Sequence, residues 1–131
     1  MADRKNQVPE VPAQFFNREL SWLAFNERVL DQAFSKHYPL LERTRFLSFV
    51  SSNLDQFYEI RVAGLMQKVD AGITQPSLYG SAPQRLLEEV RQRPKSMSQR
   101  EYACWRASLQ PALAKTGVVF KSIEQLSQSE F

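Results

Sequence analysis

The sequence is poor in the residues that build metal centres, disulfide frameworks and phosphate-binding loops. It has one cysteine (Cys104), one histidine (His37) and four glycines in 131 residues. A single cysteine excludes an intramolecular disulfide, and with one histidine it cannot supply the four ligands of a tetrahedral zinc site. The glycines lie far apart, so there is no Gly-rich phosphate loop or dinucleotide fingerprint. No apolar run reaches the roughly 18 residues of a membrane span, and the polar start does not resemble a signal peptide.

What remains is the composition of one ordinary globular domain, with 43% hydrophobic and 24% charged side chains. A chain of this length can bury enough surface to form a core without disulfides. We therefore expect a cytoplasmic, all-α domain built as an antiparallel bundle of three to four main helices.

The first half of the chain carries a helical hydrophobic period. Residues 1–14 are polar and contain two prolines, which predicts a disordered arm. Asn17 is a plausible N-cap for a helix that runs to about residue 36. Pro39 can open a second helix. Ser51, Ser52 and Asn53 then interrupt the pattern with side chains that compete for backbone hydrogen bonds, and Asn53 with Gln56 suggests a capping box that opens a third helix.

The second half predicts one more helix, interrupted by proline. Pro94 is expected to kink or split it, and Pro111 is a second conflict near its end. Gly117 stops the helix, and residues 118–120 form a short β-like run. We assign residues 15–117 to the helical domain and residues 118–131 to the truncated start of a following domain.

Few side chains suggest chemistry. His37 has no carboxylate or nucleophile at motif spacing, and Cys104 falls in an apolar helical stripe that predicts a buried structural thiol. Basic residues gather between Arg85 and Arg106, and this stripe either attracts an anionic partner or is simply a solvated helix face. The segment 51–53 predicts a polar notch at a helix N-terminus. Asn53 there is either a cap or, because its carboxamide both donates and accepts, a reader of an adenine edge.

Four segments resemble a known family. They are ELSWLAFNERVL at 19–30, PLLERTRFL at 39–47, NLDQFYEIRV at 53–62 and LQPALAKTGV at 109–118. Together they are similar, in order and spacing, to the N-terminal domain of bacterial polyphosphate kinases. The family usually has Glu at the position of Gln56, and Pro94 departs from its continuous last helix.

The resemblance implies an enzyme that reversibly transfers the terminal phosphate of ATP to inorganic polyphosphate through a phosphohistidine, with Mg²⁺. The catalytic domains would lie outside this chain, so the fragment alone is expected to be inactive and to hold no metal. The family's ATP-contacting asparagine falls on Asn53, at the adenine end of the nucleotide. A homo-oligomer of the parent enzyme is possible, and no nucleic-acid partner is expected.

Two other functions stay open at this stage. A helical interaction module would bind an anionic partner through the Arg85–Arg106 stripe, with binding that weakens steeply with salt. A purely structural or dimer-organising domain would use Asn53 only as a helix cap.

Overall fold

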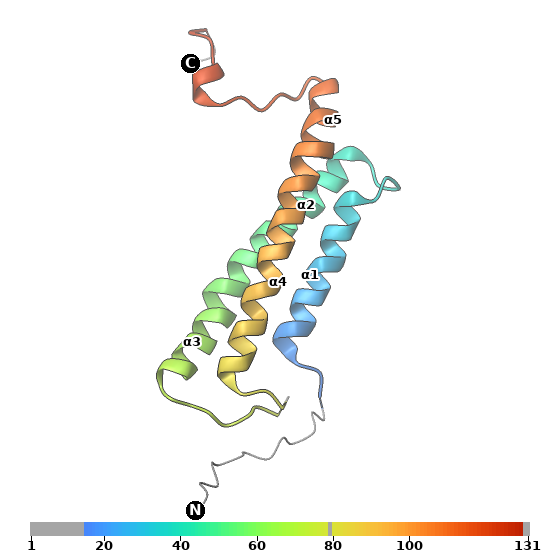
Figure 1. The fold of residues 1–131 in the computed structure, drawn as a ribbon. Helices are drawn as coiled ribbons and strands as arrows, with labels where there is room; N and C mark the ends of the chain where they lie inside the picture. Colours follow the sequence, from blue (N-terminus) through green and yellow to red (C-terminus); the bar gives the residue numbers. More distant parts are fainter. Residues whose placement is uncertain (1–14, 79, 130–131) are drawn as a thin grey trace, which may run out of the picture.

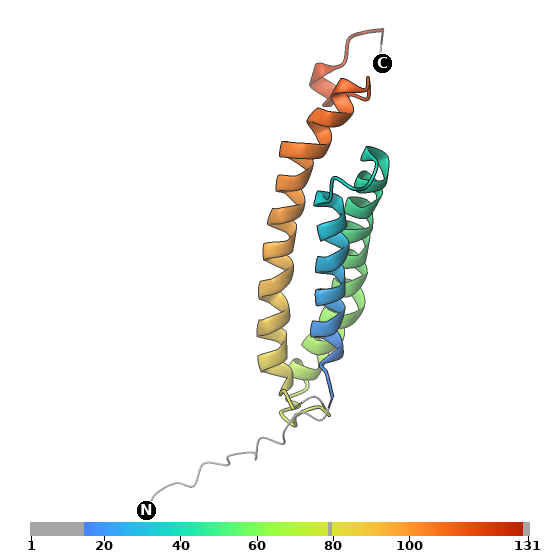
Figure 2. The same ribbon diagram turned by 90° about the vertical axis from the view of Figure 1, so that its right-hand side faces the viewer.

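A computed structural model describes residues 15–78 and 80–129, and the predicted disordered arm at 1–14 lies outside this part of the chain. The described residues form three long helical rods that run up, down and up beside one another (Figures 1 and 2). The first rod is α1 (Arg18–Phe34). The second joins α2 (Leu40–Gln56), η1 (Phe57–Val62) and α3 (Ala63–Asp70). The third joins α4 (Pro83–Cys104), η2 (Trp105–Leu109) and α5 (Gln110–Lys115). The all-α antiparallel bundle predicted from the sequence is confirmed.

Helix α1 begins as its sequence predicts. The side-chain Oδ1 of Asn17 accepts a hydrogen bond from the backbone N–H of Leu20 at 3.0 Å, and Glu19 occupies the first turn, where the helix dipole favours an acid. The helix ends at Phe34, two residues before the predicted stop, and Pro39 then precedes α2 as its N-cap residue.

The second rod corrects a prediction. Residues 51–53 were expected to end one helix, and Asn53 to cap the next, but all of them lie inside α2 and the helical backbone continues through Gln56. Serine and asparagine break helices when their side chains bond the nearby backbone. Here the Ser51 hydroxyl instead donates to Glu101 of α4, and the Asn53 amide donates to Asn26 of α1. Partners on other helices remove the competition, so no capping box forms.

The third rod contains two prolines and tolerates both. Helix α4 continues through Pro94, which is fully buried, so the rod is not split there. Pro111 follows η2, a stretch of wider π-helical turns, and stands in the first turn of α5. A wider turn shifts the hydrogen-bond register, which is how a helix accommodates a residue that lacks an N–H.

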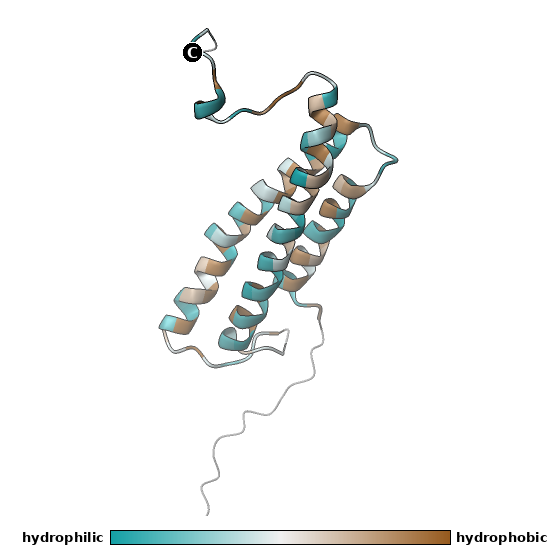
Figure 3. Ribbon diagram, turned by 45° about the horizontal axis from the view of Figure 1, so that its top comes forward, coloured by the Kyte–Doolittle hydropathy of each residue, from teal (hydrophilic) through white to brown (hydrophobic). Residues whose placement is uncertain are grey.

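The tail differs from its prediction as well. Val118, Val119 and Phe120 belong to no strand, and no strand occurs among the described residues. A β-like run needs a neighbouring strand to pair with, and none is available here. The three side chains stay about half exposed, although the Phe120 ring meets the Trp105 ring edge-on, with 4.8 Å between the ring centroids. The trace that follows α5 is coloured hydrophobic (Figure 3). A short 3-10 turn, η3 (Ile123–Gln125), follows.

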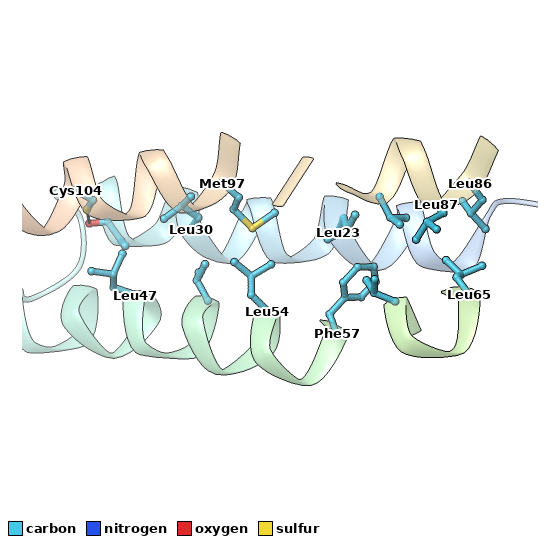
Figure 4. Packing of buried hydrophobic residues seen from close by; sticks show 14 of the residues in the cluster. Leu23, Leu30, Leu47, Leu54, Phe57, Leu65, Leu86, Leu87, Met97 and Cys104 are labelled. Atoms are coloured by element: carbon cyan, nitrogen blue, oxygen red, sulfur yellow. Dashed lines mark hydrogen bonds between the residues drawn. The ribbon is translucent and has the colours of Figure 1, made fainter. Parts of the chain in front are cut away.

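The core fills the seam between the three rods (Figure 4). Its apolar side chains recur at helical spacing on each rod, which is why one face of each is buried. From α1 come Leu23, Leu30 and Ala33; from the second rod Leu47, Val50, Leu54, Phe57, Val62 and Leu65; and from the third Leu86, Leu87, Val90, Met97, Cys104 and Leu109. No helix in the described residues is long and apolar enough to cross a membrane.

Replacing Pro94 with alanine tests the cost of the buried proline. The change restores an N–H for the carbonyl of Val90, and an interior proline costs a helix about 3 kcal/mol. The lost ring carbons remove about 1.6 kcal/mol of burial at roughly 0.8 kcal/mol per methylene. We expect Pro94→Ala to raise the free energy of unfolding by about 1 kcal/mol in urea denaturation. The exposed Lys95→Ala is the control, and a lowered urea midpoint for Pro94→Ala would show that ring packing dominates.

Candidate functional site

Asn53, the residue assigned to adenine, lies half-buried near the end of α2 with its side chain directed at α1. Its Nδ2 donates to Oδ1 of Asn26 at 2.9 Å. Because α2 continues past it, no helix begins there and no free backbone N–H groups form the predicted anion-binding notch. Any recognition at this position must come from the side-chain amide.

Asn26 connects this amide to the core. It is completely buried, and its Nδ2 donates to the backbone carbonyl of Val50 and to Sδ of Met97, both at 3.3 Å. Its Oδ1 accepts the bond from Asn53. Every polar atom of the buried amide therefore has a partner, as buried polar groups require. Three helices, α1, α2 and α4, meet at this one side chain.

Two half-exposed aromatic rings lie on the same helices as Asn53 and Asn26. Phe49 precedes it by one turn of α2 and is 49% exposed, and Phe25, next to Asn26 on α1, is 48% exposed. The guanidinium of Arg45 lies 6.0 Å from the Phe49 ring, and that of Arg28 lies 5.8 Å from the Phe25 ring. We call these five residues the Asn53 face. It combines an oriented amide, two apolar rings and two cations.

A groove of about 540 Å³ lies between α2 and the third rod. Its α2 residues, such as Ser51 and Asp55, occupy a different side of the helix from Phe49 and Asn53. Hydroxyl, carboxylate and aromatic side chains share the lining, which comprises Thr44, Leu47, Ser48, Ser51, Leu54, Asp55, Tyr58, Ser98, Glu101, Tyr102 and Trp105. Asn53 does not line this groove, so the two polar features of α2 are separate.

Glu101 lines the groove, and its pKa is shifted by its surroundings. Burial raises the pKa of its carboxyl group above the ordinary value of 4.5, the hydrogen bond from Ser51 lowers it, and the nearby charge of Asp55 raises it again. Burial is the largest of the three effects, so the pKa of Glu101 in the folded protein lies above that in the unfolded chain.

Three of the six cations in the predicted basic stripe have partners within the fold. Arg100 pairs with Asp31 of α1 at 2.6 Å, and Arg85 pairs with Glu89 at 3.4 Å. Arg106 instead lies over the ring of Tyr102, which lines the groove. Two of the cations are therefore already paired with carboxylates, and a third packs on an aromatic ring.

The remaining singled-out residues carry no chemistry in this fold. His37 is exposed in the turn between α1 and α2, where its backbone N–H donates to Ser35. Cys104 is buried, as predicted, and burial raises the pKa of its thiol, which opposes reactivity. The described residues contain no group of three or more His, Cys, Asp or Glu side chains that could hold a metal.

Comparison with known proteins gives the family. Residues 15–121 match the family model described as polyphosphate kinase N-terminal domain. The chain belongs to this family. It is 43% identical over 119 residues to a polyphosphate kinase of Prosthecochloris aestuarii, covering 90% of this chain and 17% of that protein. It is 46% identical over 130 residues to one from Erythrobacter litoralis, covering 98% of this chain and 18% of that protein.

This chain spans about one sixth of the length of the curated polyphosphate kinases that it matches. Sequence reasoning placed Asn53 but missed Asn26 and the groove residue Glu101. Both looked like ordinary helix residues, and only packing shows that one is buried and the other shares a groove with Asp55. A polar residue at a buried helical position, between Leu23 and Leu30, was the available signal for Asn26.

Glu101→Gln tests the electrostatics of the groove. Because folding raises the Glu101 pKa, this residue favours the fold most below pH 4.5, and that contribution declines as pH rises through the folded-state pKa. Glutamine keeps an acceptor for Ser51 without the charge. We expect Glu101→Gln to be more stable than wild type at pH 7, by less than about 1 kcal/mol for this half-exposed group, with the gain shrinking toward pH 4.

The measurement is chemical denaturation at a series of pH values, with the exposed Glu88→Gln as control. A loss of stability at pH 7 that disappears toward pH 4 would contradict the assignment, because it would show that the ionised carboxylate stabilises the fold.

Proposed function

We propose that this domain forms the adenine end of the ATP site in a polyphosphate kinase, an enzyme that reversibly transfers the terminal phosphate of ATP to inorganic polyphosphate. The names of its relatives support the reaction, and the orientation of the Asn53 amide supports the role of the domain. Phosphoryl transfer depends on positioning and on stabilising charge at the moving phosphate. This domain would contribute positioning at the base.

The amide of Asn53 is the observation that carries the proposal. One of its N–H groups is bonded to Asn26, while the described residues provide no partner for its Oδ1. The free oxygen and the second N–H match the donor and acceptor that adenine offers side by side. Phe49, one turn from Asn53 on the same face of α2, provides half-exposed apolar surface suited to the face of a purine ring.

The rest of the reaction is assigned outside this domain. The described residues do not fit a Mg²⁺ site, because no group of three carboxylate or histidine ligands converges. The phosphohistidine, the metal and the polyphosphate contacts would belong to the much longer remainder of the protein, and this chain alone would be inactive. The cytoplasmic location and a homo-oligomeric parent enzyme stay predictions.

Replacing Asn53 with alanine in the full-length protein tests the adenine contact. Losing one hydrogen-bonding group costs about 1–1.5 kcal/mol, so the KM for ATP should rise about tenfold with a smaller effect on kcat. Ser52→Ala, one residue away on the exposed side of α2, is the matched control. The variant also leaves Asn26 Oδ1 without its donor, so kinetics are measured below the unfolding range of both variants. An unchanged KM for ATP in folded enzyme would refute the proposal.

An NMR titration of the 131-residue chain separates the alternatives. ATP shifts centred on residues 49–57, lost in Asn53→Ala and not produced by tripolyphosphate, support base recognition by this domain. Equal shifts of residues 85–106 with every anion would favour the electrostatic module. If neither group shifts, the domain alone does not bind the nucleotide, and the kinetic test decides between an adenine contact completed by other domains and a purely structural role.

A further inference from the structure

Asn26 is the only completely buried polar side chain among the described residues. It lies in an apolar seam close to Leu23 and Leu30 of its own helix, in a place where a leucine would satisfy the hydrophobic pattern. Burying an amide is costly unless all its hydrogen-bonding groups are satisfied. Asn26 is costly to bury, and it contacts Asn53, the residue proposed to recognise adenine. We therefore looked to Asn26 for a specific role.

The partners of Asn26 fix the direction of its amide. Both N–H groups of its Nδ2 are directed at acceptors, the Val50 carbonyl and the Met97 sulfur, neither of which can donate. If the amide were turned over, its oxygen would face the Val50 carbonyl, and two buried acceptors would oppose each other. The oxygen of Asn26 must therefore point toward Asn53.

This direction is passed on to Asn53. Since Asn26 presents an oxygen, Asn53 must present its Nδ2, at 2.9 Å. Turning the Asn53 amide over would place one side-chain oxygen against another and leave the buried Asn26 oxygen unsatisfied, at a cost of about 1–3 kcal/mol. One arrangement of Asn53 is strongly preferred before any ligand arrives.

We propose that Asn26 is a positioning residue for base selectivity: through its bond to Asn53 it holds the Asn53 oxygen as the acceptor for the 6-amino group of adenine. This inference rests on the proposed function. Adenine carries a donor at that position, whereas guanine carries a carbonyl acceptor. A freely rotating asparagine could serve either base by turning its amide over, but an asparagine held by Asn26 matches adenine and opposes the guanine oxygen with its own.

A merely structural Asn26 makes a different prediction. In that case its loss would lower stability and impair ATP and GTP turnover equally. A positioning Asn26 changes the ratio between the two nucleotides, and that ratio is independent of the fraction of enzyme that is folded.

The test compares Asn26→Leu, Asn53→Ala and Met97→Leu in the full-length protein. Leucine has the same branched skeleton of four heavy atoms as asparagine, with bulkier end groups, and suits the apolar seam; exchanging a buried polar side chain for an apolar one of similar shape can be nearly neutral. Met97→Leu removes the sulfur acceptor but leaves the Asn26–Asn53 bond, so it is the matched control. The readout is kcat/KM for ATP, for GTP and for the purine nucleoside triphosphate that lacks the 6-amino group.

We expect Asn26→Leu to reduce the preference for ATP over GTP about five- to tenfold, mainly through a lower KM for GTP, because a freely turning Asn53 can donate to the guanine carbonyl, the equivalent of one gained hydrogen bond. The advantage of ATP over the analogue without the amino group should change less, because the freed Asn53 can still accept from the amino group of adenine. Met97→Leu should keep both ratios.

The outcomes separate the two proposals. If Asn53→Ala removes the preference and Asn26→Leu retains it, the positioning role is wrong and the adenine contact stands. If Asn53→Ala also leaves the preference and the KM for ATP unchanged, the proposed function fails and the positioning role fails with it.

A measurement on the unaltered 131-residue chain covers the case in which Asn26→Leu does not fold. The two Nδ2 protons of Asn53 should exchange with water at clearly different rates in NMR spectra, because one is bonded to Asn26. Equally fast exchange of both protons would show a freely turning amide and would overturn the inference.

Discussion

The buried amide of Asn26 is the directional interaction on which the alignment of this bundle depends. Apolar contacts between helices are non-directional, so leucine and valine side chains alone tolerate small slides and rotations of one rod against another. The amide does not, because its groups reach the Val50 carbonyl on α2 and the Met97 sulfur on α4 together. Any shift of α1 by a turn would leave those groups buried without partners. The same side chain then orients Asn53.

Polar contacts between rods also explain the unbroken second helix. Ser51 and Asn53 bond to residues on other rods, in opposite directions across α2. One partner lies in the groove toward α4, and the other lies in the seam with α1. Helix α2 thereby presents two different surfaces: an acidic and aromatic groove around Glu101, and the Asn53 face with its rings and cations. The proposed nucleotide base is assigned to the Asn53 face, because the carboxylates Glu101 and Asp55 of the groove would oppose the negative charge of its phosphates.

Much of the fold followed from local pattern. The N-cap at Asn17, the all-α class and the buried Cys104 were predictable because each depends on spacing along a single helix. The predicted helix break at residues 51–53 was wrong because the preferences of serine and asparagine were read without their long-range partners. The β-like run at 118–120 failed for a related reason, since a strand requires a neighbour that the pattern cannot supply.

The sequence by itself determined that amphipathic helical stretches would pack as an antiparallel bundle, because hydrophobic period and proline positions are local properties. Its motifs also pointed to Asn53, since the resemblance is carried by contiguous segments. Only the tertiary structure decided how the Asn53 amide is held, that Asn26 holds it, and that Arg100 pairs with Asp31 of α1. These features depend on side chains that are 27 to 71 residues apart in the chain and meet only when the rods pack.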